Sequence, residues 1–262
     1  MPTVDRIRAK ITRAKQHIQD FQLAARAFAD SNPFEVRFKE DANRGERIFY
    51  LAKVDPVPEH LAAIAADVIQ NLRSPLDHIA YQLVLAARGC AKPDWDVYYP
   101  IAPSAARYPA TRKGAIKGVR QEVIDAIDAT EPYEGGKGEI LWQLNELNKP
   151  DKHELLIAAA AFSRGFSHHL DPAILKRIPP SERAAFSGPM CFIRHADPLP
   201  AKVGDELYVE PINVEVNKNR QFTFHISFNT PRVAEDESAL TRLQEMANRV
   251  DDIITQLGSL LP

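Results

Sequence analysis

Apolar residues recur at helical spacing along three long stretches of the chain. The stretches cover residues 3–30, 58–88 and 236–260, and each carries an apolar residue at nearly every third or fourth position. This period places the apolar side chains on one side of a helix, where they pack against other elements. The pattern therefore predicts three long helices that pack along one another in a bundle.

A strand period follows the first of these helices. Residues 34–54 alternate apolar and polar positions on both sides of the turn sequence DANRGE. Alternation around a turn rich in Asn, Asp and Gly is typical of a β-hairpin. We therefore expect an antiparallel hairpin between the first two long helices.

The second half of the chain combines shorter helical signals with short strands. Helices are predicted within 111–162, with a break or kink at Pro150. The region 185–230 is rich in proline and holds short apolar segments, of which QFTFHISFN alternates most clearly. The sequence NKNR at 217–220 is expected to turn the chain between the last two strands. We expect SHHLD (167–171) to lie in a loop.

These elements predict a single α+β domain over residues 1–262, in which a bundle of long helices carries a hairpin and a small antiparallel sheet. Four ranges make up the expected helical core: 3–30, 58–88, 111–162 and 236–260. The hairpin at 34–54 follows the first helix, and the β-rich insertion at 185–230 precedes the last. Because the first and last helices bracket the chain, we expect them to lie together.

Composition narrows the class of protein without identifying a ligand. The formal net charge is -2, and 45% of the residues are hydrophobic and 26% charged, as in ordinary soluble proteins. This balance gives no general attraction to nucleic acid or to a membrane surface. The charged N-terminus does not resemble a signal peptide, and no run of about 18 apolar residues occurs. We therefore expect a cytoplasmic protein that does not span a membrane.

Metal-binding patterns are absent from the sequence. Cys90 and Cys191 are the two cysteines, and they form no Cys-x-x-Cys pair, which excludes a zinc ribbon and gives no basis for a disulfide framework. Glu-x-x-His and His-x-x-x-His pairs are also missing. We therefore expect neither a metal nor a cofactor.

The predicted helix at 58–88 carries a group of polar residues around NLRSPLDHIAYQLV. Four of them share one stripe on the flank of the apolar face: Asp67, Asn71, Ser74 and His78. Arg73 and Asp77 lie four residues apart on nearly the opposite side of an ideal helix, a spacing typical of a surface ion pair. Pro75 removes one helical hydrogen bond, so we expect a bend there.

A second polar group lies in LNELNKPDKHELL, residues 144–156. Asn145 and Asn148 fall on one helical face, and beyond Pro150 the next helix opens with Asp151, Lys152 and His153. One interpretation is that Asn148 or Asp151 caps free backbone N–H groups beside Pro150. The other is a polar cleft between helices, to which both groups contribute. The expected lining of that cleft comprises Asp67, Asn71, Arg73, Ser74, Asp77, His78, Asn148, Asp151, Lys152 and His153.

Four segments of the chain resemble a widespread family of uncharacterised bacterial proteins. These segments are NLRSPLDHIAYQLV, YYPI, EPY and LWQLNELNKPDKHELL. The resemblance covers roughly residues 5–165. It implies a bacterial origin and no particular activity.

Within the same region, RSPLDH resembles the motif of the HEPN superfamily, in which an arginine precedes a histidine by a few residues. HEPN proteins are helical domains that include metal-independent ribonucleases. The resemblance implies attack of an RNA 2′-hydroxyl on the adjacent phosphate, with His78 as general acid or base and Arg73 holding the phosphate. Asn71 and His153 complete the implied catalytic set. The implied partners are RNA and a second copy of the chain in a homodimer.

Three functions follow from these patterns. The first is a binding or scaffold protein with a polar cleft between helices, and it is the interpretation that we favour. The second is a HEPN-like ribonuclease or an RNA-binding toxin or defence protein. The third is a metal-binding bundle enzyme that uses His78, Asp151 and His153.

Overall fold

The computed structural model describes most of the chain. The described residues are 2–89, 91–149, 161–168, 190–191, 201–213, 221–228, 230, 233 and 237–262. Contacts group the chain into two compact units. Unit 1 comprises Met1–Arg26, Pro58–Ile157 and Thr230–Pro262, and unit 2 comprises Ala27–Val57 and Ala158–Asn229. Helices and strands are both present, so the predicted α+β class is confirmed.

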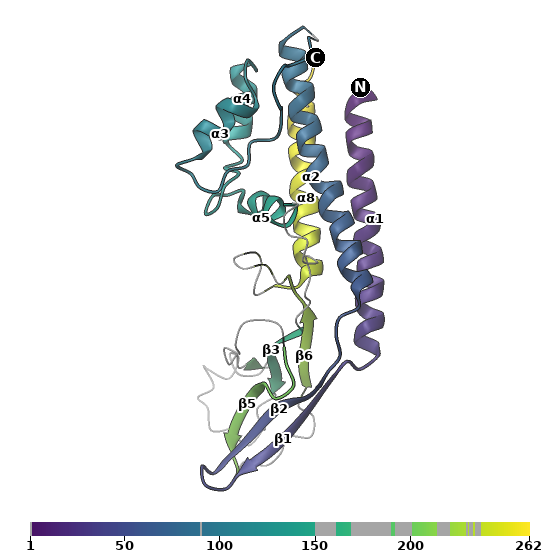
Figure 1. Cartoon of the computed structure of the whole chain (residues 1–262), viewed down its shortest axis with the longest axis vertical. Helices are drawn as coiled ribbons and strands as arrows, with labels where there is room; N and C mark the ends of the chain where they lie inside the picture. The colour runs from purple at the N-terminus through teal and green to yellow at the C-terminus, as the bar shows by residue number, and fades with distance from the viewer. Residues whose placement is uncertain are drawn as a thin grey trace, which may run out of the picture. The chain divides into compact units, whose positions relative to one another are not determined.

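Unit 1 contains the helices of the described chain. Their bounds are α1 Pro2–Asp30, α2 Glu59–Ala87, α3 Tyr108–Ala115, α4 Gln121–Asp128, α5 Glu139–Leu147 and α8 Ala239–Gly258. The last residues of α1 belong to unit 2. Within unit 1, α1, α2 and α8 lie side by side, and α1 runs antiparallel to α2 (Figure 1).

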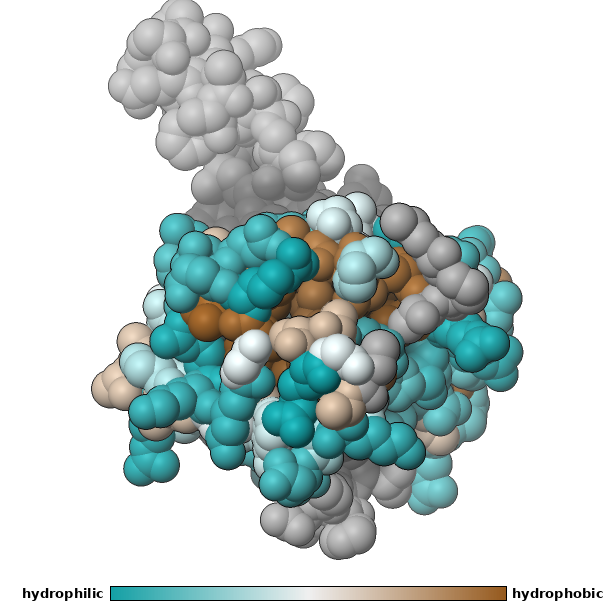
Figure 2. All heavy atoms as spheres, turned by 90° about the horizontal axis from the view of Figure 1, so that it is seen from above, coloured by the Kyte–Doolittle hydropathy of each residue, from teal (hydrophilic) through white to brown (hydrophobic). Residues whose placement is uncertain are grey.

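The apolar stripes of these three helices form the core of unit 1. On α1 the buried residues are Ile7, Ile11, Ala14, Ile18 and Phe21, which follow the predicted helical period. The first and last helices lie together, as predicted, because Lys15 forms an ion pair with Asp251 and Arg8 donates a hydrogen bond to Thr255. Seen from the helix ends, apolar surface gathers in a central hollow surrounded by hydrophilic side chains (Figure 2).

The helix α2 continues without interruption past Pro75, which is buried. A proline cannot donate a hydrogen bond to the carbonyl four residues earlier, which here belongs to Asn71. In the preceding turn, the side chain of Asn71 donates a hydrogen bond to the carbonyl oxygen of Asp67 at 2.8 Å. The expected bend at Pro75 therefore does not end the helix, and the packing of its apolar face keeps one element of 29 residues.

Unit 2 contains two antiparallel three-stranded sheets. The first has the order β1-β2-β5, with β1 Phe34–Asp41, β2 Glu46–Val54 and β5 Glu206–Pro211. The second has the order β4-β3-β6, with β3 Ala161–His168, β4 Met190–Cys191 and β6 Gln221–Ile226. Strands β1 and β2 form the hairpin predicted from the alternation at 34–54.

Two predictions about the second half of the chain are wrong. The hairpin expected through NKNR is not seen among the described residues, where β5 pairs with β2 and β6 pairs with β3 in a different sheet. Residues 161–168 form β3, whereas the sequence favoured a helix as far as 162 and a loop at 167–171. Pairing with the alternating strand β6 outweighs the local helical signal of the preceding alanines. The residues 217–220 and 150–160 themselves lie outside the described chain.

Aromatic rings join the two sheets of unit 2. The rings of Phe34 and Phe224 stack with their centroids 4.6 Å apart, and those of Phe49 and Phe222 lie 6.0 Å apart. Rings at these separations attract one another and also bury apolar surface. Unit 2 therefore has a core of its own.

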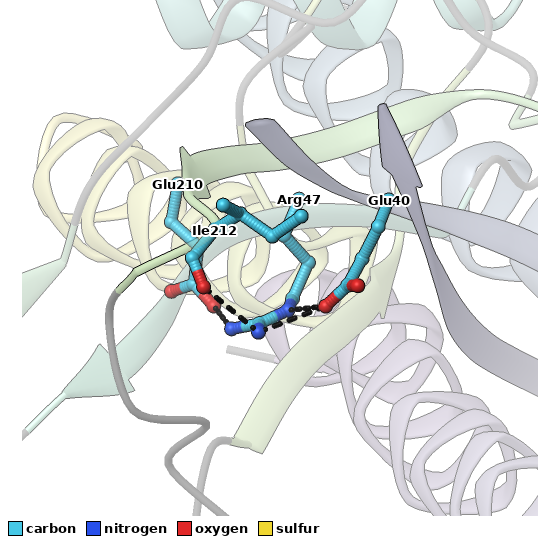
Figure 3. A network of polar contacts seen from close by, with 4 residues as sticks. All are labelled: Glu40, Arg47, Glu210 and Ile212. Atoms are coloured by element: carbon cyan, nitrogen blue, oxygen red, sulfur yellow. Dashed lines mark hydrogen bonds and ion pairs between the residues drawn. The ribbon is translucent and has the colours of Figure 1, made fainter. Parts of the chain in front are cut away.

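A buried arginine ties the first sheet together. Arg47 lies on the central strand β2, opposite Glu40 on β1 and Glu210 on β5. Its Nη1 lies 2.8 Å from Glu210 Oε1, its Nη2 lies 3.0 Å from Glu40 Oε1, and Nη2 also donates to the carbonyl oxygen of Ile212 (Figure 3). Hydrogen bonds to Glu210 and then to Glu40 raise the pKa of Arg47. The guanidinium thus links all three strands.

Candidate functional site

Arg73 is buried in unit 1, with 8% of its surface exposed. Its Nε donates a hydrogen bond to Oδ1 of Asn145 on α5 at 3.2 Å, and its Nη1 forms an ion pair with Asp77 on α2. Nη2 donates to the carbonyl oxygen of Tyr99 at 3.5 Å. Because every nitrogen has a partner, the guanidinium is held in one orientation between α2, α5 and the segment that contains Tyr99.

The position of Arg73 corrects the expectation of a surface ion pair. The helical wheel correctly separated Arg73 and Asp77 from the apolar stripe, but the opposite side of α2 does not face water at this point. There α2 meets α5 and the chain around Tyr99. Asp77 is only partly exposed, because its Oδ1 also accepts a hydrogen bond from the backbone N–H of Tyr99 at 2.9 Å.

Tyr99 is fully buried at the centre of this cluster. Its hydroxyl lies 2.9 Å from the hydroxyl oxygen of Thr130, which donates to the carbonyl oxygen of Ile127. Burial raises the pKa of Tyr99 to about 12, although the hydrogen bond with Thr130 opposes the rise. The phenol is therefore neutral at physiological pH and cannot act as a base there.

A second tyrosine lies near the first in the same unit. Tyr108 donates a hydrogen bond to Asp128 Oδ1 at 2.7 Å, and Arg112 forms an ion pair with Oδ2 of the same carboxylate at 2.6 Å. Burial and then the hydrogen bond to Asp128 raise the pKa of Tyr108. These contacts join α3 to the end of α4 and use the hydroxyl donor of Tyr108 inside the protein.

The polar stripe predicted on α2 lies on a different side of the helix from Arg73. Asp67 and His78 are exposed, and Asn71 and Ser74 are half-buried. His78 lines a groove with residues of α1, whereas Arg73 contacts α5 and Tyr99. The structure therefore does not bring the implied catalytic pair, Arg73 and His78, into one site.

The second polar group is described only in part. Asn145 provides the contact with Arg73, while Asn148 ends α5, where its backbone N–H donates to the carbonyls of Leu144 and Asn145. Asp151, Lys152 and His153 lie outside the described residues. The residue that connects α5 to the polar side of α2 is thus Asn145 rather than Asn148.

Two grooves flank α1. One, of about 400 Å³, lies between α1 and α8, and its charges are balanced, since Lys15 pairs with Asp251 at 2.6 Å. The other, of about 450 Å³, lies between α1 and α2. Its lining residues are Arg6, Ile7, Lys10, His78, Tyr81 and Gln82. This second groove, called the α1–α2 groove below, contains three basic side chains and no carboxylate.

Sequence reasoning missed the contribution of α1 to this groove. A signal was present, because residues 6–19 contain five lysines and arginines and no acidic residue. Arg6 and Lys10 are four residues apart, a spacing that places them on one face of a helix. The buried position of Tyr99 had no comparable local signal, since it depends on contacts with residues far away in the sequence.

Within the described chain, no group of three or more His, Cys, Asp or Glu is arranged to hold a metal ion. In the same residues, no helix is long and apolar enough to cross a membrane.

Comparison with protein-family models, with curated proteins and with solved structures found no match. The site must therefore be interpreted from its own geometry.

Proposed function

We propose that the chain is a binding protein built on a helical bundle. In this proposal Arg73 and its partners Asn145, Asp77 and Tyr99, called the Arg73 cluster, stabilise the packing of the helices and do not form a catalytic centre. The observation that supports this proposal is the burial of the Arg73 guanidinium, in which each nitrogen contacts a partner: Asn145, Asp77 or Tyr99. A phosphate-binding arginine in a nuclease needs free donors that face the substrate. Arg73 is buried and each of its three nitrogens already contacts a partner in the protein, so a substrate phosphate would have to compete with those contacts.

The α1–α2 groove is where such a protein would offer unused polar groups. Its volume of about 450 Å³ lies within the range of small-molecule sites, roughly 300–1,000 Å³. The groove and the Arg73 cluster lie on different sides of α2, so one can bind while the other maintains the packing. This separation favours binding over the HEPN-like ribonuclease that the motif implied.

An RNA-cleavage assay tests the proposal against the ribonuclease alternative. Wild type, His78→Ala and His17→Ala would be incubated with single-stranded RNA in the presence of a chelator. His17→Ala is the matched control, because His17 is a histidine of α1 that does not line the groove and lies near Asp20. We expect no cleavage above background in any sample. Cleavage by wild type and His17→Ala that is lost in His78→Ala would overturn the proposal.

A further inference from the structure

The α1–α2 groove gathers positive charge without a counter-charge. Arg6 and Lys10 come from α1, and His78 faces them from α2. Across the described part of the chain, none of the three forms an ion pair with a carboxylate. The neighbouring groove shows the usual alternative, in which Lys15 of the same helix is paired with Asp251.

Like charges held side by side repel each other, and a bound anion removes that repulsion. Arg6 and His78 are exposed and Lys10 is half-buried, so water and solutes reach all three. Their guanidinium, ammonium and imidazole groups, which line the same groove, are groups that proteins use to bind phosphate. The charge pattern therefore fits a ligand with a phosphate group.

The rest of the lining indicates more than an inorganic ion. Ile7 is only 3% exposed and forms an apolar floor, and the half-buried ring of Tyr81 adds a flat apolar wall. A volume of about 450 Å³ is many times that of one phosphate ion. The space beside the cations suits a small apolar or aromatic group.

We propose that the α1–α2 groove binds a small organic phosphate, whose phosphate lies against Arg6, Lys10 and His78 and whose organic part packs on Ile7 and Tyr81. This inference rests on the proposed binding function and names the ligand class. A polyanion such as RNA fits less well, because the two cations Arg6 and Lys10, with the imidazole of His78, match one phosphate group and the chain has a net charge of -2.

Titration calorimetry with phenyl phosphate tests the proposal, with phenol and inorganic phosphate as partial ligands. Phenyl phosphate carries both the charge and the apolar ring. We expect saturable binding of phenyl phosphate, with each partial ligand at least about tenfold weaker, since each lacks one set of contacts. Equal affinity for inorganic phosphate and phenyl phosphate would remove the apolar part of the proposal.

Charge-removing variants locate the site. Arg6→Gln and Lys10→Gln are each expected to weaken phenyl phosphate binding about tenfold, as the loss of one charge-assisted contact implies. Lys113→Gln is the matched control, because it removes one positive charge from an exposed position on α3. It should leave the affinity unchanged. Arg6 is exposed, so Arg6→Gln tests the site without disturbing the core.

Several results would overturn the inference. No saturable binding of phenyl phosphate, or equal binding in the Arg6→Gln/Lys10→Gln double variant, would exclude this ligand class from the groove. A short single-stranded RNA that binds more tightly than phenyl phosphate and depends on the same two residues would assign the groove to RNA instead. These results concern ligand binding in the groove. The proposed function is tested separately, and it would be overturned by RNA cleavage that depends on His78.

Discussion

Arg73 and Asp77 together satisfy both backbone groups of Tyr99. Asp77 accepts the N–H of that residue, and Arg73 donates to its C=O. Tyr99 lies outside regular secondary structure, and its C=O also accepts the backbone N–H of Ile101 at 2.9 Å. A buried peptide group without a partner costs free energy comparable to a lost hydrogen bond. The two side chains therefore fix the path of the chain between α2 and α3.

Replacing Arg73 should destabilise the protein. Arg73→Met leaves Asn145 Oδ1 without this donor and Asp77 without its ion-pair partner, and we expect a loss of roughly 2–3 kcal/mol in the free energy of unfolding. Arg73→Lys keeps the charge but cannot reach all three partners, so it should recover less than half of the loss. Urea denaturation measures both, and Arg13→Met, at an exposed position of α1, is the control. A change below about 0.5 kcal/mol in Arg73→Met would contradict the structural role.

Tyr99 should make the protein sensitive to alkaline pH. Its pKa rises from 10.0 to about 12 on folding, so the unfolded chain loses the proton first as the pH increases. The stabilisation is fully present below pH 10 and is lost between pH 10 and about 12, by on the order of 2–3 kcal/mol. Denaturation of Tyr99→Phe and wild type across this range measures the difference. The two proteins should converge in stability at high pH, and a constant difference would argue against the raised pKa.

Residue-level reasoning from the sequence succeeded where the information was local. The Arg73–Asp77 pair follows from the spacing of four, and it is present. Its burial could not be predicted, because the wheel gives the angle of a side chain but not what lies opposite. Asn145 and Tyr99 reach Arg73 from 72 and 26 residues away. His78 was expected to meet the residues after Pro150, which lie outside the described chain, so that contact stays a prediction, while its described groove neighbours include residues of α1.

At the scale of elements, the sheet β1-β2-β5 depends on a pairing that is distant in sequence. The hairpin of β1 and β2 is local in sequence. By contrast, β5 (Glu206–Pro211) begins 152 residues after the end of β2 (Glu46–Val54). A turn sequence predicts the first kind of pairing and carries no information on the second. For that reason the hairpin of β1 and β2 was predicted correctly. The hairpin through NKNR was not, because β5 and β6 have partners that are distant in sequence. The pairing of Arg47 with Glu210 could not be predicted from the sequence, because it depends on the register between β2 and β5.

Removing the charge of Glu210 should loosen β5. Glu210 is 3% exposed and faces Arg47, so Glu210→Gln removes the charge of the buried carboxylate and leaves the half-exposed Glu40 to balance the buried guanidinium. We expect amide hydrogen exchange in β5 to accelerate by at least about tenfold. Glu35→Gln is the control, since Glu35 forms an exposed pair with Arg37 on β1. Unchanged exchange in β5 would mean that the ion pair does not hold the strand.

At the scale of the whole molecule, the chain passes between the two units four times. Unit 1 is assembled from three segments and unit 2 from two, and α1 contributes residues to both. Neither unit is therefore a continuous piece of sequence. The single domain that the sequence predicted stays a prediction. The connectivity favours it, because unfolding of one unit frees the ends of the segments from which the other unit is built.

Unfolding measurements can decide between one cooperative domain and two. The two tryptophans, Trp95 and Trp142, both belong to unit 1, so fluorescence reports on that unit, whereas far-UV circular dichroism reports on both. For a single domain the two signals should change at the same urea concentration. Glu210→Gln, which acts on unit 2, should then lower the fluorescence midpoint by the same amount as the dichroism midpoint. An unshifted fluorescence midpoint in Glu210→Gln, together with a shifted dichroism signal, would establish two independently folding units, because the lost ion pair then weakens only the sheets.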